Sequence, residues 1–125
     1  MKYLGIDFGL RRVGLATSEG ELAAPFKTMK VNNFQDAVSK VLEQVKVAGY
    51  NKIVVGLPEG WMKQNVLGFV SRLKKDGIEV ETFDETLSSK KAKQTMIELG
   101  VPVKKRRHED AYSAAHILQD YLDSL

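Results

Sequence analysis

The chain has 125 residues, of which 43% are hydrophobic, a length and an apolar share that suit a single domain with its own core. It contains no cysteine, which excludes disulfides and thiolate metal sites but leaves sites built from oxygen ligands open. The net charge of +3 is unevenly distributed, because residues 90–107 hold seven Lys or Arg and one Glu, a segment charge of +6 that leaves −3 elsewhere. We expect an anionic partner near this segment, with a solvated basic surface as the alternative.

No stretch approaches the roughly 20 apolar residues of a membrane span, and the amino terminus lacks the apolar segment of a signal peptide. We therefore expect a cytoplasmic protein. Residues 1–125 are expected to form one domain, because no internal repeat, linker or low-complexity tract divides them. Whether the protein is a monomer or a homodimer is left open.

The opening residues predict a buried strand that delivers an acid to its end. Residues 2–6 form a short, mainly apolar segment, and Asp7 follows it directly. Gly9 then permits a tight turn. Residues 12–17 alternate with the period of a strand, and residues 22–29 predict a third strand that Pro25 makes an edge or a bulged one. Strands joined this closely are expected to be antiparallel neighbours.

The middle of the chain predicts helices that alternate with further strands. The first helix is capped by Asn32 or Asn33 and ended by Gly49. The next expected elements are a buried parallel strand at 52–58, a helix with its apolar stripe at 66–73, and a half-exposed strand at 78–83.

Two helices complete the chain, one that is capped by Thr86 or Ser88 and ended by Gly100, and one over residues 109–122. The wide apolar stripe of the last helix suits packing on a sheet. The predicted fold class is α/β, with a five-stranded mixed sheet of three antiparallel and then two parallel strands, flanked by helices.

Acidic residues stand where strands end or helices begin: Asp7, the pair Asp84 and Glu85, and Asp110. Adjacent strand residues point to opposite faces, so only one of the pair can join a shared site, and we favour Glu85. Carboxylates in contact repel by up to about 4 kcal/mol per pair at an effective dielectric of about 20, a cost that bound Mg²⁺ or Mn²⁺ would offset. Such a site suits phosphodiester hydrolysis. The alternative is that these acids share no site, and that each one ends a strand or caps a helix in solvent.

Four segments in chain order resemble the YqgF (RuvX) family and span nearly the whole chain. They are GIDFG with RVGLA at 5–9 and 12–16, IVVGLP at 53–58, DETLS at 84–88 and DAYSAAHILQDYL at 110–122. The resemblance implies a ribonuclease H-like fold, kinship to RuvC resolvases, and a metal-dependent nuclease of pre-16S rRNA 5′ ends or of Holliday junctions. By the same resemblance, Asp7, Glu85 and Asp110 are the expected catalytic metal ligands.

The chain departs from the family pattern at two places. Residues 59–64 replace a longer polar loop that contains an Asp-Gly step, and Thr86 stands where the family has an arginine. These changes affect how substrate is held beside the metal. Glu59 is a possible substitute ligand, with a solvated loop residue as the alternative.

Basic residues close to the acids are candidates for contacts to the phosphate backbone of a structured RNA or a branched DNA. The predicted contacts are Lys104, Lys105, Arg106 and Arg107, with Arg11 and Arg12 as secondary candidates. Such contacts should weaken steeply with salt and carry no base information, so RNA and DNA are not distinguished. Trp61 and Met62 could stack on an unpaired base, but we expect this pair to anchor the start of a helix.

Two other classes of function remain. A non-catalytic RNA- or DNA-binding module could keep the fold without effective metal binding, which the altered loop after Pro58 favours. A phosphate-handling ATPase of the actin and sugar-kinase type has a similar strand end, but the chain is too short for its two lobes.

Overall fold

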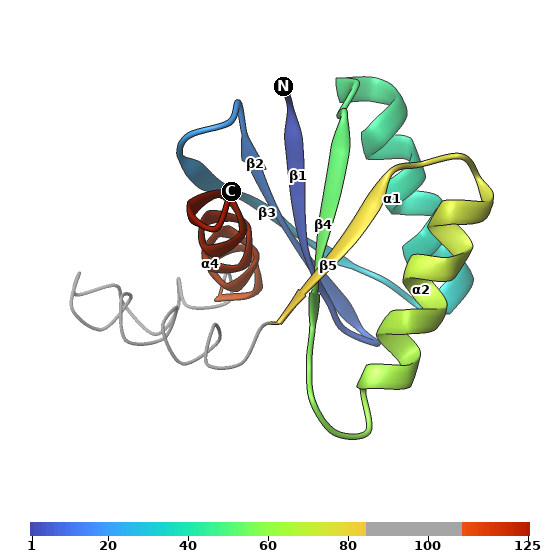
Figure 1. The fold of residues 1–125 in the computed structure, drawn as a ribbon. Coiled ribbons are helices and arrows are strands. Elements are labelled where there is room, and N and C mark those ends of the chain that lie inside the picture. Colours follow the sequence, from blue (N-terminus) through green and yellow to red (C-terminus); the bar gives the residue numbers. More distant parts are fainter. Residues whose placement is uncertain (85–108) are drawn as a thin grey trace.

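The computed structural model describes residues 1–84 and 109–125, which form a twisted sheet between two layers of helices (Figure 1). In chain order, the elements are β1 (Tyr3–Phe8), β2 (Arg12–Ser18), β3 (Ala23–Lys30), α1 (Phe34–Ala48), β4 (Lys52–Leu57), α2 (Lys63–Lys75), β5 (Val80–Asp84) and α4 (Glu109–Asp123). Helices α1 and α2 cover one face of the sheet and α4 covers the other. The helix expected between Thr86 and Gly100 falls outside the described residues.

The sheet confirms the predicted α/β class and strand directions. Its five strands follow the order β3-β2-β1-β4-β5. β1 is antiparallel to β2, and β2 is antiparallel to β3, whereas β1, β4 and β5 run parallel. The carboxyl ends of β1, β4 and β5 therefore lie at one edge of the sheet, where open α/β folds place their ligands.

Local signals set the helix and strand ends that the sequence predicts best. The backbone amide of Asp36 donates to Asn33 Oδ1 (2.8 Å), which identifies Asn33 as the N-cap of α1. Gly49 ends that helix in the left-handed conformation with φ 68°. Pro25 lies on the edge strand β3, where the pairing with β2 shifts register.

The expected end of the first strand was wrong, and this end carries the candidate ligand Asp7. The predicted first strand stops before Asp7, but β1 continues to Phe8 because Asp7 pairs with Gly14 of β2. Asp7 therefore lies within the hydrogen-bonded sheet, in the last two residues of its strand. A carboxylate held by the ladder has a better-defined direction than one in a turn.

Apolar side chains on the two faces of the sheet form two separate clusters. Leu4, Ile6 and Phe8 belong to the cluster under α1 and α2. Tyr3 belongs to the cluster under α4. Since side chains alternate along a strand, residues 3, 5 and 7 of β1 face α4. The burial of both faces explains why β1 reads as an almost continuous apolar run.

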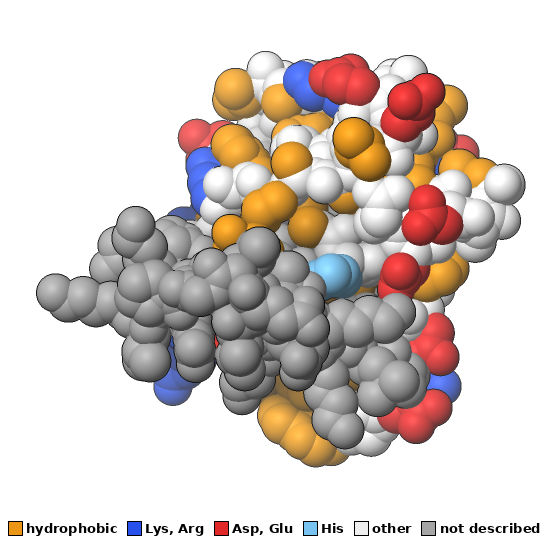
Figure 2. Space-filling model, turned by 90° about the vertical axis from the view of Figure 1, so that its left-hand side faces the viewer, with side chains coloured by type: hydrophobic (Ala, Val, Ile, Leu, Met, Phe, Trp, Pro, Cys, Tyr) orange, Lys and Arg blue, Asp and Glu red, His pale blue; other side chains and the backbone are white. Residues whose placement is uncertain are grey.

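Helix α4 lies close to the sheet because two glycines make room for it. A Cβ on Gly5 would lie 2.8 Å from Cβ of Leu118. A Cβ on Gly14 would lie 2.0 Å from the carbonyl oxygen of Asp110. Figure 2 views the molecule from the α4 side and shows apolar and acidic side chains on the described part of this face. In residues 1–84 and 109–125, no helix is long and apolar enough to cross a membrane.

Candidate active site

Asp7 lies on the α4 face of the central strand, between two glycine positions. Its partner on β2 is Gly14. On the other side, the parallel pairing of Ile6 with Val55 places Gly56 of β4 next to it, one step further along. Neither neighbour carries a side chain, so the half-buried carboxylate of Asp7 is not flanked by bulky groups within its sheet face.

Asp110 reaches the same place from the other end of the chain. It is the second residue of α4, and its backbone carbonyl lies directly over Gly14, the pairing partner of Asp7. Partners in an antiparallel pair have Cα atoms about 4.5 to 5.5 Å apart. The structure therefore brings the backbone of Asp110 close to that of Asp7, and these are two of the three acids that were predicted to share a site.

Arg12 contacts Asp110, a pairing that sequence reasoning missed. The Arg12 Nε lies 3.1 Å from Asp110 Oδ2, and the exposed fractions of the two side chains are 57% and 27%. Such an exposed pair is worth less than about 1 kcal/mol, so a stronger cation could displace the guanidinium. Arg12 and Gly14 lie on the same face of β2, but only the approach of α4 brings Asp110 to that face.

The third predicted acid, Glu85, lies outside the described residues, as do Lys104, Lys105, Arg106 and Arg107. Its neighbour Asp84 ends β5 and pairs with Leu57 at the end of β4. The ring of Phe83 contacts Tyr121 of α4 at 6.0 Å, so Phe83 faces α4 and the alternation of side chains directs Asp84 to the opposite face.

Within residues 1–84 and 109–125, no group of three or more His, Asp or Glu side chains could hold a metal ion. Glu59 is exposed in the loop after β4, and it does not complete a three-acid group with Asp7 and Asp110 in this part of the chain. The described residues therefore give no support to Glu59 as a substitute metal ligand.

An open pocket of about 390 Å³ lies beside Asp110. Its lining residues are Phe8, Gly9, Leu10, Arg11, Arg12, Trp61, Met62 and Asp110. Both secondary phosphate candidates, Arg11 and Arg12, therefore line the pocket beside Asp110. Trp61 is 75% exposed, so the expectation that this aromatic ring anchors the start of α2 was wrong, whereas its neighbour Met62, the N-cap of α2, does pack against the core.

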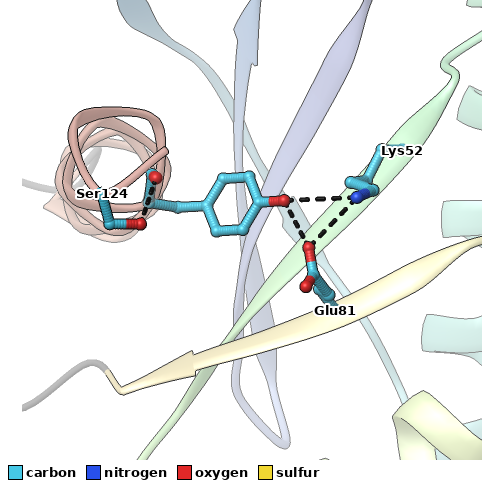
Figure 3. A network of polar contacts seen from close by, with 4 residues as sticks. Lys52, Glu81 and Ser124 are labelled. Carbon is cyan, nitrogen blue, oxygen red and sulfur yellow. Dashed lines mark hydrogen bonds and ion pairs between the residues drawn. The ribbon is translucent and has the colours of Figure 1, made fainter.

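A polar network joins α4 to two parallel strands (Figure 3). The Tyr121 hydroxyl donates to Glu81 of β5, and Lys52 of β4 contacts both, at 3.2 Å from Glu81 Oε2 and 3.3 Å from the Tyr121 hydroxyl. The hydrogen bond from Tyr121, together with the ammonium of Lys52, lowers the pKa of Glu81. The network therefore joins the amino-terminal part of β5 to α4.

This arrangement defines a class of protein. A mixed sheet of order β3-β2-β1-β4-β5, with helices on both faces, has the topology of the ribonuclease H-like fold. The RuvX family model, described as Holliday junction resolvase, matches residues 1–124. The chain belongs to this family, and the predicted resemblance is confirmed.

Relatives of similar length share about a third of their residues with the chain. A protein of Natranaerobius thermophilus is 34% identical over 98% of the chain and 94% of its own length. One of Chloroflexus aggregans is 37% identical over 97% of the chain and 92% of its own length. Both carry the name "Putative pre-16S rRNA nuclease".

Solved structures confirm the fold. RuvC of T. thermophilus, in complex with a Holliday junction substrate, superposes with a TM-score of 0.64 at 17% identity, over 99% of the chain and 96% of RuvC. The fowlpox virus resolvase, in complex with Holliday junction DNA, superposes with a TM-score of 0.66 at 9% identity, over 99% and 98% of the two chains. The predicted ribonuclease H-like fold is thereby confirmed.

Proposed function

We propose that the protein is a divalent-metal-dependent nuclease that hydrolyses phosphodiester bonds in nucleic acid, with Asp7, Glu85 and Asp110 as metal ligands. The observation that supports this most directly is the meeting of Asp7 and Asp110 across Gly14, although they come from opposite ends of the chain. The family description and the names of the relatives support a nuclease independently.

The donor set fits a hard cation. Asp7 and Asp110 offer carboxylate oxygens, which Mg²⁺ and Mn²⁺ prefer, and Asp110 already binds the guanidinium of Arg12. A bound cation would supply activated water and stabilisation of the leaving oxygen. The chain's own part is to hold the two carboxylates at one edge of the sheet and to present Arg12 to a phosphate once it leaves Asp110.

Glu85 is the third ligand that we propose, and Asp84 is not. Phe83 faces α4, so alternation turns Asp84 away from Asp7 and favours the following residue. The end of β5 is also level with the ends of β1 and β4, since Asp84 pairs with Leu57. The residue that follows Asp84 is therefore the one that we propose to reach the site of Asp7 and Asp110.

The substrate that we propose is structured nucleic acid, with the 5′ region of pre-16S rRNA ranked before branched DNA. The names of the relatives favour ribosomal RNA precursors, whereas the family description names Holliday junctions. Lys104, Lys105, Arg106 and Arg107 are proposed as backbone contacts, because they precede Asp110 in the sequence.

A cleavage assay tests the proposal. RNA that contains a pre-16S 5′ region and a four-way DNA junction are incubated with the protein and Mg²⁺ or Mn²⁺. We expect Asp7→Asn and Glu85→Gln to reduce the rate by more than about hundredfold, and the matched variant Asp84→Asn to retain activity. Full activity in Asp7→Asn would refute the assignment. Salt-sensitive RNA binding without cleavage in either metal would instead favour a non-catalytic binding module.

A further inference from the structure

The pocket beside Asp110 combines an exposed aromatic ring, an exposed aliphatic side chain and guanidinium groups. We propose that Trp61 and Arg11 form a subsite for one unpaired nucleotide next to the bond that is cut, with the base on the indole and the phosphate on the guanidinium. This inference rests on the proposed nuclease function and specifies its substrate as nucleic acid with an unstacked nucleotide at the cleavage point.

Trp61 is held in an outward position by the turn that precedes α2. Gly60 adopts φ 87°, which other residues rarely adopt, and the Lys63 amide donates to the Gly60 carbonyl (3.2 Å). Met62 packs against the core next to it, while Trp61 stays 75% exposed. The ring therefore stands on a fixed backbone turn with much of its surface in water.

Leu10 adds to this surface from the turn between β1 and β2. It is 44% exposed and lines the same pocket as Trp61. Single exposed apolar side chains are common, but two at one pocket that also holds charged groups are typical of a binding site. Stacking on a base would remove this apolar surface from water.

The two arginines differ in what they contact. Arg12 is paired with Asp110 at 3.1 Å. Arg11 is exposed, and its backbone carbonyl accepts a hydrogen bond from Val31 (2.9 Å), which ties the turn to the end of β3. We therefore assign the phosphate of the stacked nucleotide to Arg11, whereas Arg12 becomes available to a phosphate only after it leaves Asp110.

The size and chemistry of the pocket favour an unpaired nucleotide over a duplex. A volume of about 390 Å³ is small, and a side chain can stack on a base only where the neighbouring base has been removed from that face. In a perfect duplex both faces of internal bases are covered. Because Asp110 lines the same pocket, a nucleotide bound there lies beside one of the proposed metal ligands.

Trp61 is the only tryptophan of the chain, so its fluorescence reports directly on the subsite. The protein is titrated in EDTA, where no cleavage is needed, with a single-stranded RNA, the same sequence as DNA, and a blunt, fully paired duplex. We expect saturable quenching by at least one single strand and little by the duplex. Quenching by only one of RNA and DNA would also identify the sugar that the site accepts.

Binding of labelled single strands, measured by fluorescence anisotropy, supplies the second readout. We expect Trp61→Ala to bind about 5- to 100-fold more weakly and Trp61→Phe to retain most of the affinity, because a phenyl ring also stacks. The matched variant Phe26→Ala removes an exposed aromatic that does not line the pocket and should bind normally. Arg11→Ala should reduce the dependence of the binding constant on salt concentration by the amount expected for about one phosphate contact.

Unchanged binding in Trp61→Ala, or equal quenching by duplex and single strand, would refute the subsite. Neither result depends on catalysis, so the nuclease proposal would stand. Conversely, nucleic acid should quench the Trp61 fluorescence of Asp7→Asn as much as that of the unchanged protein. If Asp7→Asn also cleaved normally, the nuclease assignment would fail while the binding site remained.

Discussion

At Gly14 a hydrogen atom stands where other residues carry a Cβ, and the Asp110 carbonyl oxygen lies 2.0 Å from that Cβ position. Backbone oxygen atoms cannot yield as a flexible side chain can. Since Gly14 is also the pairing partner of Asp7, the same contact that seats α4 sets the distance between the two acids.

Gly14→Ala should therefore damage stability and the site together. We expect the free energy of unfolding to fall by at least about 1 to 3 kcal/mol, because the methyl group forces the start of α4 away from β2. Urea denaturation measures this, and the cleavage assay should show a parallel loss of activity as Asp110 moves from Asp7.

Gly68→Ala is the matched control. Gly68 lies in α2, and its added Cβ would have nothing within 4 Å, so we expect a gain of about 0.5 to 1 kcal/mol from reduced chain entropy. If both glycine variants changed stability equally, the close approach of α4 at Gly14 would be disproved.

Among the elements, β4, β5 and α4 are joined by side chains as well as by packing. Lys52, Glu81 and Tyr121 bridge the three, and the Tyr121 ring also contacts Tyr3 and Phe83 at 6.2 and 6.0 Å. The network couples a charged group to the fold, so it should appear in the dependence of stability on pH.

Tyr121→Phe should reduce stability at neutral pH by about 1 kcal/mol, because it removes the hydroxyl and keeps the ring. The folded protein holds the pKa of Glu81 below its ordinary value of 4.5, so this contribution is present above that value and is lost as pH falls through the folded pKa. The variant should therefore lose less stability between neutral pH and about pH 3 than the unchanged protein.

Urea denaturation at both pH values measures the difference. Tyr3→Phe is the control, because Tyr3 packs against Tyr121 in the same cluster without a place in the network. An identical pH dependence in Tyr121→Phe and the unchanged protein would show that the network does not stabilise the charge of Glu81.

For the whole molecule, bound cations and folding are linked. Any ligand that binds only the folded chain stabilises it, by about 2.7 kcal/mol at a hundred times its dissociation constant. The acids of the proposed site are dispersed in the unfolded chain, so Mg²⁺ and Mn²⁺ should meet this condition.

We expect Mn²⁺ to raise the melting temperature of the unchanged protein in a concentration-dependent way, and Asp7→Asn to lose most of this rise. Thermal unfolding followed by circular dichroism measures both. Asp84→Asn removes an equal charge at the edge of the same sheet and should keep the response. A rise of the same size in Asp7→Asn would place the cation elsewhere.

Much of the fold was predictable because its signals are local. Asn33 and Gly49 delimit α1 through contacts within a few residues, and Pro25 marks an edge strand because it lacks an amide hydrogen. The end of β1 was not predictable in the same way, since the pairing of Asp7 with Gly14 comes from a neighbouring strand.

The sequence by itself determined the α/β class, the strand directions, the family resemblance, and Asp7 and Asp110 as candidate ligands. These follow from residue type and from short-range spacing along the chain. Only the tertiary structure decided that α4 seats Asp110 over the partner of Asp7, that Arg12 pairs with Asp110, and that Trp61 faces water. These contacts depend on how closely distant segments approach one another. That distance is determined by side-chain packing in the folded protein and not by spacing along the chain.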